Sequence, residues 1–236
     1  MGYGMRDFFT FGNIKSAEYN AWIGGSGTFA APSRDITEVT VPGRNGSLTI
    51  DNGRYKNVTL TYEAFIPNDF ETNFNGLKAA LLSQKGNQRL EDTFHLEHFR
   101  RGRFNGNIKP DMWQKNRAGS FELEFDCDAR LFLKSGEETH TFTASGSLMN
   151  DTLFEAKPMI RAYGTGSFAI GSYTITISSA DVYTDIDLET MNAYKGSTNK
   201  NAYVTIPDGA CLVPGVNNVA MSGITKLEII PRWWTL

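Results

Sequence analysis

The chain has 236 residues, of which 40% are hydrophobic and 12% are aromatic, and its formal net charge is −3. This composition excludes a wholly disordered chain, and the small negative charge gives no general attraction to nucleic acid or anionic membranes. Residues 1–134 carry 17 basic and 16 acidic side chains, whereas residues 135–236 carry 6 and 10. The change from a charge-rich to a charge-poor half predicts two domains, 1–137 and 138–236.

The first strong local signal is a turn between two segments in which apolar and polar residues alternate. The turn reads Pro42-Gly43-Arg44-Asn45-Gly46, and the apolar positions that flank it are Val39, Val41, Leu48 and Ile50. Proline ends one strand, and Asn-Gly favours the positive φ angles of a tight hairpin turn. We therefore predict a hairpin, with a further turn at Asp51-Asn52-Gly53. We also expect Arg44 to anchor the turn, or an adjacent subunit, through a carboxylate or backbone carbonyls.

Alternation with a period of two returns in two further segments and predicts antiparallel strands with one buried face. Apolar residues occupy every second position of residues 58–64 and of residues 121–131. In the second segment the intervening positions are charged: Glu122, Glu124, Asp126, Asp128 and Arg130. Between the two segments, Asp69 as N-cap, apolar residues at helical spacing and Gly86 at the end predict one helix across one face of the sheet.

The second half of the chain has the pattern of a separate β-rich unit. Turn signals such as Gly164-Thr165-Gly166 and Pro214-Gly215 separate its short alternating segments. The strands predicted there are Met159–Tyr163, Tyr173–Ile177, Val182–Leu188, Ala202–Ile206 and Leu227–Ile230. Five or more such strands favour a β-sandwich. At the end of the chain, we expect Trp233 and Trp234 to pack on a last strand, because two exposed tryptophans would favour aggregation.

The acidic row Glu122, Glu124, Asp126 and Asp128 invites comparison with glycosidases. Carboxylates two positions apart on a strand are separated by about 6.6 Å, which is within the range of inverting enzymes. These side chains are parallel along one strand, however, and do not oppose one another across a cleft. We therefore interpret the row as a solvated or ring-lining face and predict that the protein is not an enzyme.

Metal and redox chemistry is not indicated by the histidines and cysteines. His95 and His98 are three positions apart, His140 stands alone, and zinc needs three or four converging ligands. Cys127 and Cys211 are too few for a disulfide framework, and no segment has the roughly 20 apolar residues of a membrane span. We predict no metal, no cofactor, no membrane insertion, and assembly in a reducing cytoplasm.

A basic cluster lies between two phenylalanines and consists of Arg100, Arg101 and Arg103. Arginines with neighbouring aromatic rings can bind single-stranded nucleic acid. Acidic residues close by in the sequence cancel this charge, namely Glu91, Asp92 and Glu97. We therefore predict salt bridges between subunits here and no specific nucleic-acid binding.

Taken in order, these features resemble the distal tail (Dit) proteins of long-tailed bacteriophages that infect Gram-positive bacteria. The resemblance covers nearly the whole chain and depends on an ordered set of short motifs. They are Phe11-Gly12-Asn13-Ile14-Lys15-Ser16 with Tyr19, Pro42-Gly43-Arg44-Asn45-Gly46, Gly53-Arg54-Tyr55-Lys56-Asn57, the single helix, Phe121-Glu122-Leu123-Glu124-Phe125-Asp126-Cys127, Lys157-Pro158-Met159-Ile160, Gly164-Thr165-Gly166, Ile186-Asp187-Leu188-Glu189, Pro214-Gly215-Val216-Asn217 and Pro231-Arg232-Trp233-Trp234.

The resemblance implies a mainly β fold with an N-terminal β-sandwich or barrel-like domain that carries one α-helix, followed by a C-terminal galectin-like β-sandwich. It implies a structural role in the virion, as a hexameric ring of the tail tip or baseplate. Such a ring joins the tail tube to the tail-associated hub protein and the host-recognition apparatus. The implied partners are further copies of the chain, the major tail tube protein, the hub protein, the tape measure protein, and receptor-binding or baseplate proteins.

Two expectations concern exposed surfaces. We expect part of the row Glu122, Glu124, Asp126 and Asp128 to face the channel through which DNA passes, because a basic lining would hold phosphates. The alternative function is a carbohydrate-binding module that adheres to host cell-wall glycans. Such a module would need an exposed aromatic platform, formed by Trp113, Trp233 or Trp234. The chain is also too short to hold the inserted carbohydrate-binding modules of longer Dit relatives.

Overall fold

The computed structural model describes residues 6–24, 29–106, 108–113 and 117–236, and it divides the chain into two compact units. Unit 1 comprises Met1–Leu131 with Leu236, and unit 2 comprises Phe132–Thr235. The division between the units follows Leu131, whereas the boundary expected from the sequence lies at 137/138; the 3-10 helix η2 (Lys134–Glu137) lies between these two positions and belongs to unit 2. Each unit has a hydrophobic core of its own.

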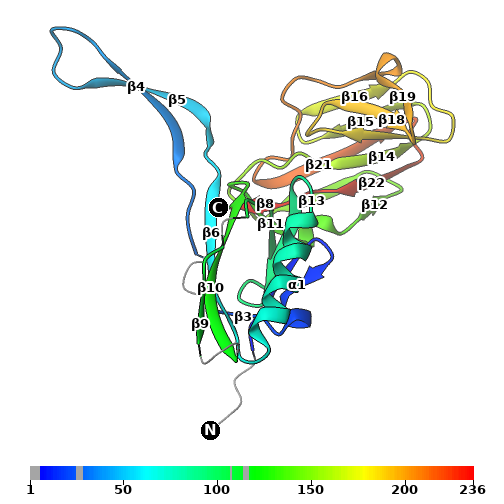
Figure 1. Ribbon diagram of the computed structural model, residues 1–236. Coiled ribbons are helices and arrows are strands. Elements are labelled where there is room, and N and C mark those ends of the chain that lie inside the picture. Colours follow the sequence, from blue (N-terminus) through cyan, green and yellow to red (C-terminus); the bar gives the residue numbers. More distant parts are fainter. Residues whose placement is uncertain (1–5, 25–28, 107, 114–116) are drawn as a thin grey trace. The chain divides into compact units, whose positions relative to one another are not determined.

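The predicted mainly β fold with one helix is confirmed, since α1 (Phe70–Ser83) is the one α-helix among the described residues (Figure 1). A 3-10 helix, η1 (Ser16–Tyr19), also belongs to unit 1. The strands of unit 1 are β1 (Phe9–Phe11), β2 (Ile14–Lys15), β3 (Trp22–Gly24), β4 (Arg34–Thr40), β5 (Ser47–Tyr55), β6 (Val58–Ile66), β7 (Gln88–Asp92), β8 (His98–Phe104), β9 (Pro110–Trp113) and β10 (Ala118–Cys127). Strand β11 (Leu131–Leu133) begins at the boundary.

The main sheet of unit 1 has the strand order β2-β1-β7-β8-β10-β6-β3, and β9 pairs with β10 as well. The sheet curls, so that aromatic side chains from distant strands meet in one core. The ring of Phe9 stacks on Tyr62 with centroids 5.6 Å apart, and the ring of Phe11 lies 5.0 Å from Phe125. These contacts between β1 and the β6–β10 pair give the barrel-like body that the sequence implied.

Helix α1 covers the inner face of the β6–β10 pair (Figure 1). Its buried residues are those at the predicted helical spacing: Phe70, Phe74, Leu77 and Leu81. The ring of Phe74 meets Phe121 of β10 edge to face, with centroids 5.0 Å apart. Asp69 is the N-cap residue, as predicted, but it has a φ of 49° and its side chain makes no capping hydrogen bond. Gly86 lies beyond the C-cap residue, Gln84.

Strands β4 and β5 form the predicted hairpin as a separate two-stranded sheet. Its connection is longer than a two-residue turn, and the positive φ angles fall at Gly43 (80°) and Gly46 (81°). The further turn predicted at Asp51-Asn52-Gly53 is wrong, because β5 continues through these residues to Tyr55. The pairing register shifts there, and Gly53 with a φ of 71° occupies a bulge. A glycine with positive φ serves a bulge as well as a turn, so the local sequence could not separate them.

Unit 2 is a β-sandwich, as predicted. Its two sheets have the orders β12-β22-β14-β17-β18-β19 and β13-β21-β15-β16-β20, and buried aliphatic side chains such as Ile160 and Ile175 form its core. Its strands are β12 (His140–Phe142), β13 (Gly146–Asn150), β14 (Met159–Tyr163), β15 (Gly166–Ile170), β16 (Tyr173–Ile177), β17 (Tyr183–Asp187), β18 (Asn192–Lys195), β19 (Thr198–Asn199), β20 (Val204–Thr205), β21 (Gly215–Ser222), β22 (Lys226–Ile230) and β23 (Trp234–Thr235), with the 3-10 helix η3 (Asn201–Tyr203). The predicted bounds of β14 and β16 are correct, whereas β15 and β21 begin at Gly166 and Gly215, which the sequence pattern places in turns.

Candidate functional surfaces

The face of the β6–β10 pair opposite α1 carries the acidic residues. Strands β6 and β10 pair so that Glu63 lies directly opposite Glu122, with Glu124 two positions further along β10. We call these three residues the acidic face. All three side chains are exposed, and none forms an ion pair with another described residue. A hollow of about 520 Å³ lies on this face, lined by Glu63, Ala64, Lys109, Asp111, Ser120, Phe121, Glu122 and Glu124.

The other half of the predicted acidic row is neutralised. The carboxylate of Asp126 forms an ion pair with the guanidinium of Arg103 at 2.8 Å. It also accepts a hydrogen bond from the side-chain amide of Asn57 at 3.0 Å. Asp128 lies beyond the end of β10, where the guanidinium of Arg130 donates to it at 2.7 Å. Burial raises the pKa of Asp128, but the hydrogen bonds and charge of Arg130 outweigh burial and hold that pKa below its usual value. Asp126 and Asp128 are thus paired with arginines, unlike Glu122 and Glu124 of the same row.

The like charges of the acidic face destabilise the sheet, and its carboxylates do not have the geometry of a glycosidase site. Like charges directly opposite each other on neighbouring strands destabilise a sheet, and Glu63 and Glu122 are such a pair. The three carboxylates extend from one sheet face side by side, whereas a glycosidase needs two that flank a bound sugar. Among the described residues, no three acidic, histidine or cysteine side chains are placed to hold a metal ion. The face is thus a patch of negative potential, open to solvent.

The three arginines of β8 do not form one surface cluster. Alternation along the strand turns Arg100 inward, where it is 5% exposed and donates to the carbonyl oxygen of Ala129 at 3.0 Å. Arg101 and Arg103 are exposed on the other side, and Arg103 pairs with Asp126. Arg100 is therefore not available for the predicted salt bridges between subunits.

His95 is held by structural contacts. The Nδ1 atom of His95 lies 3.0 Å from one carboxylate oxygen of Asp92, and the hydroxyl of Tyr62 donates to the other oxygen at 2.8 Å. Tyr62 is fully buried, and burial together with the charge of Asp92 raises its pKa well above the usual value. This group ties β6 to the end of β7 and needs no ligand to explain it.

The Pro42–Gly46 turn leaves its arginine free. The backbone N–H of Arg44 donates to the carbonyl oxygen of Val41 at 3.2 Å. The Arg44 side chain is exposed and makes no hydrogen bond or ion pair with another described residue. Anchoring of the turn by this side chain is therefore wrong, and contact with an adjacent subunit remains a prediction.

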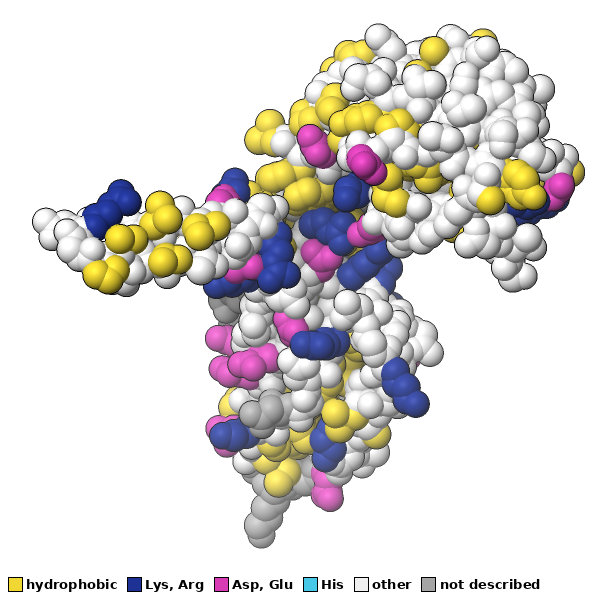
Figure 2. All heavy atoms as spheres, turned by 90° about the horizontal axis from the view of Figure 1, so that it is seen from above, with side chains coloured by type: hydrophobic (Ala, Val, Ile, Leu, Met, Phe, Trp, Pro, Cys, Tyr) yellow, Lys and Arg dark blue, Asp and Glu magenta, His cyan; other side chains and the backbone are white. Residues whose placement is uncertain are grey.

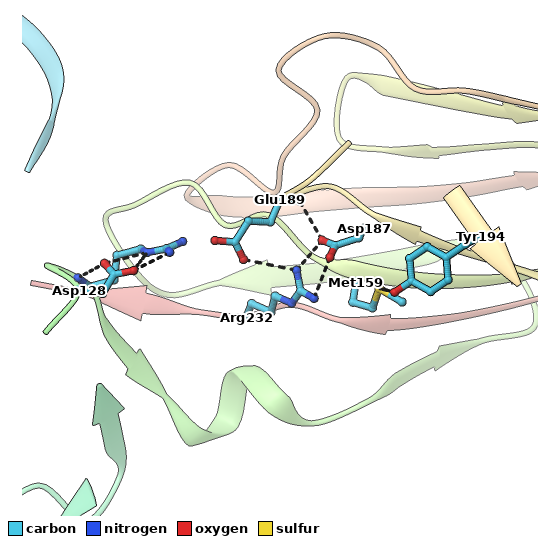
Figure 3. A network of polar contacts seen from close by, with 7 residues as sticks. Asp128, Met159, Asp187, Glu189, Tyr194 and Arg232 are labelled. Carbon is cyan, nitrogen blue, oxygen red and sulfur yellow. Dashed lines mark hydrogen bonds and ion pairs between the residues drawn. The ribbon is translucent and has the colours of Figure 1, made fainter. Parts of the chain in front are cut away.

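The C-terminal motif of unit 2 meets the Ile186–Glu189 motif through an arginine. Arg232 has a φ of 61°, and its guanidinium donates to the two carboxylate oxygens of Asp187 at 2.6 and 3.4 Å (Figure 3). The same guanidinium lies 3.6 Å from a carboxylate oxygen of Glu189. Burial raises the pKa of Asp187, but the hydrogen bond from Arg232 outweighs it and leaves that pKa below its usual value.

The two terminal tryptophans pack within unit 2. Trp233 is 7% exposed and precedes β23. Trp234 lies in β23, stacks on Phe154 with centroids 4.3 Å apart, and donates its indole N–H to the carbonyl oxygen of Glu155 at 2.9 Å. Trp233 is therefore buried, whereas Trp234 is partly exposed and stacks on Phe154. Trp113 of β9 is 49% exposed.

Comparison with solved structures places both units in one known fold. The crystal structure of SPP1 Dit, described as a paradigm of the hub adsorption apparatus in phages that infect Gram-positive bacteria, matches with a TM-score of 0.74 and 14% identity over 94% of this chain and 97% of that chain. The phage P2 baseplate in its activated conformation with Ca matches with a TM-score of 0.55 and 10% identity over 95% and 97% of the two chains. The form with Sr gives 0.55 and 11% over 95% and 96%. No protein-family model and no curated protein sequence matches.

These matches confirm the Dit-like fold that the sequence motifs implied. At such identities the likeness concerns the fold alone, and the galectin-like character of unit 2 stays a prediction. No helix among the described residues is long and apolar enough to cross a membrane.

Proposed function

We propose that the chain is a structural component of a bacteriophage tail tip or baseplate, and that six copies form a ring. The observation that carries this proposal is the likeness to SPP1 Dit over 94% of the chain, which includes both units in the same order. If only one of the two units had the same fold as SPP1 Dit, the other unit would be left unmatched. The two-unit match therefore favours a shared architecture over a widespread β-sandwich used for another purpose.

In this proposal each unit has its own partners. Unit 1 closes the ring and docks on the major tail tube protein, while the hub protein binds below and the tape measure protein passes through the centre. Unit 2, as a galectin-like sandwich, carries receptor-binding or baseplate proteins and so contributes to host attachment. The chain would assemble in the cytoplasm of the bacterial host and remain in the virion. It would act by shape and contact, without enzymatic activity.

The acidic face gives the ring a channel lining. Glu63, Glu122 and Glu124 repel one another, so the fold keeps them together at a cost. A negative lining does not hold the phosphates of passing DNA, because phosphate binding requires neutralising basic groups. We assign the channel role to these three residues and leave out Asp126 and Asp128, whose charges are already neutralised by Arg103 and Arg130.

Light scattering and electron cryomicroscopy of the full chain test the proposal together. We expect a mass of six copies, alone or in equilibrium with trimers, and a ring with Glu122 and Glu124 on its inner wall. A ring with these two residues on its outer rim would exclude the channel lining and keep the structural role. A chain that is monomeric at every concentration, and that binds cell-wall glycans on an array, would show the carbohydrate-binding module instead.

A further inference from the structure

The β4–β5 hairpin exposes a stripe of aliphatic side chains along one face. Val39 pairs directly with Leu48, and Thr37 pairs with Ile50, so these side chains point to the same side. The stripe consists of Val39, Val41, Leu48 and Ile50, each between 37% and 46% exposed. Figure 2 shows hydrophobic side chains spaced along this hairpin, the narrow projection at the left of that view. Ile36 lies next to Thr37 and therefore on the opposite face.

Within unit 1, no described strand extends the sheet of this hairpin. Every residue of β5 except Tyr55 is exposed, and the hairpin pairs with no further strand among the described residues. A two-stranded hairpin that packs against nothing is marginally stable in water at best. Two ion pairs brace it, Arg34 with Asp51 at 3.0 Å and Arg54 with Asp35 at 2.7 Å, but exposed ion pairs contribute little. The stripe therefore needs a partner.

The charge of the hairpin does not favour a strongly charged partner. Residues 34–55 hold three basic and three acidic side chains, so the hairpin has no net attraction for a polyanion or an anionic membrane. The two ion pairs leave one unpaired cation, Arg44, and one anion, Glu38, among its described residues. Unit 1 also leaves Leu82, Leu96 and Met112 more than half exposed. Unit 1 therefore has further exposed apolar side chains besides the stripe.

The stripe is small, which favours an assembly in which the same contact is repeated between copies. β4 has seven residues, which gives the face a length of roughly 23 Å, and two paired strands are roughly 10 Å wide. A face of about 230 Å² is far below the roughly 800 Å² per partner of a stable pairwise interface. In a closed ring each copy gives one hairpin and receives another, so the buried area per chain doubles and all contacts hold simultaneously.

We propose that the β4–β5 hairpin docks its apolar stripe on unit 1 of a second copy of this chain and so links neighbouring copies. This inference rests on the ring assembly proposed above and adds the surface that holds the ring together. Because the stripe is exposed in the single chain, polar substitutions there should weaken assembly and leave the fold of each copy intact.

Two isoleucines on opposite faces of the hairpin provide a matched test in the full chain. Ile50→Thr alters the stripe, and Ile36→Thr alters the other face; both residues are similarly exposed, at 46% and 43%. A third variant, Val39→Thr/Leu48→Thr, removes the central apolar pair and places threonine, a residue that strands favour, at both positions. Assembly is measured by light scattering and sedimentation over a concentration series, and folding by circular dichroism and thermal melting.

We expect Val39→Thr/Leu48→Thr to raise the concentration at half assembly by about tenfold or more, and Ile50→Thr by about threefold. Ile36→Thr should change it by less than about twofold, and all variants should melt like the wild type. Stripe variants that assemble normally would overturn the inference and leave the proposed ring standing. Variants that still assemble but no longer join tail tubes would also overturn the inference, because the partner that covers the stripe would then be a tail protein. A wild-type chain that never assembles would contradict both proposals.

Discussion

At the residue scale, Arg232 shows how a side-chain interaction can hold a backbone conformation that most residues avoid. Its φ of 61° lies in the left-handed region, which costs a residue other than glycine about 1 kcal/mol or more. The conformation lets the guanidinium reach Asp187 and Glu189 from the segment before β23. Asp187 is only 15% exposed in its side chain, so this pair is screened less than the exposed ion pairs of the hairpin.

The pair with Arg232 predicts a pH dependence of stability. The pKa of Asp187 is lowered by folding. Its contribution is therefore fully present above the unfolded pKa of about 4, and it is lost as the pH falls through the lower folded value. We expect Asp187→Asn to reduce the unfolding free energy at pH 7 by about 1–3 kcal/mol and to flatten its decline below about pH 4. Urea unfolding at a series of pH values measures both effects.

Asp181 supplies the control for that experiment. Its carboxylate also pairs with lysines, Lys200 at 3.1 Å and Lys195 at 3.7 Å, but the side chain is 59% exposed. Solvent screens such a pair, so Asp181→Asn should change the pH profile much less. Equal acid dependence in the wild type and Asp187→Asn would show that Arg232 does not stabilise the carboxylate as described.

At the element scale, the close approach of β8 to β10 depends on a glycine. Gly102 pairs with Cys127, and a Cβ atom at this position would lie 2.5 Å from the Cys127 sulfur and 2.9 Å from the carbonyl oxygen of Asp126. Because Cys127 is fully buried, neither strand can move without disturbing the core. A side chain here is therefore excluded by packing, although the sequence Arg-Gly-Arg gives no sign of it.

Gly102→Ala should destabilise the protein by about 1–3 kcal/mol, because the added methyl group forces the two strands apart. The matched control is Gly24→Ala in β3 of the same sheet, where the nearest atom would be 3.7 Å from the new Cβ. We expect less than about 0.5 kcal/mol from packing at that position. Chemical denaturation followed by fluorescence gives both values, and equal destabilisation by the two variants would contradict the packing argument.

At the scale of the whole molecule, the two separate cores predict two unfolding transitions. Thr184 offers a probe for unit 2, because its hydroxyl is fully buried and has no hydrogen-bond partner among the described residues. Thr184→Val keeps the shape and removes the unsatisfied oxygen, so it should stabilise unit 2 by about 1 kcal/mol. Calorimetry of the full chain should show this shift in one transition only.

The same experiment has controls in each unit. Thr176→Val changes an exposed threonine of β16 and should leave both transitions in place. Gly102→Ala should lower only the transition of unit 1. If Thr184→Val and Gly102→Ala move the same single transition, the two units unfold together and the description of two independent cores is wrong.

Local sequence patterns were sufficient for several elements. The alternation of apolar residues determined which faces of β6 and β10 are buried, because a strand turns successive side chains to opposite sides. Helical spacing determined the buried stripe of α1, and the change in charge along the chain indicated two domains. The order of short motifs was enough to predict the Dit-like fold. The buried faces of the strands and the helix depend on neighbours within a few positions, and the charge change and the motif order are properties of the sequence itself, so all of them can be read directly from the chain.

Tertiary structure alone decided how the charges are used. Strand register sets Glu63 opposite Glu122, and residues distant in sequence neutralise Asp126 and join Arg232 to Asp187. It also showed that Arg100 points inward and that the hairpin stripe is uncovered. Sequence determines the period of a strand, but charge pairing and exposure depend on which distant segments fold against it. For that physical reason the surfaces proposed to act in assembly became visible only in the folded chain.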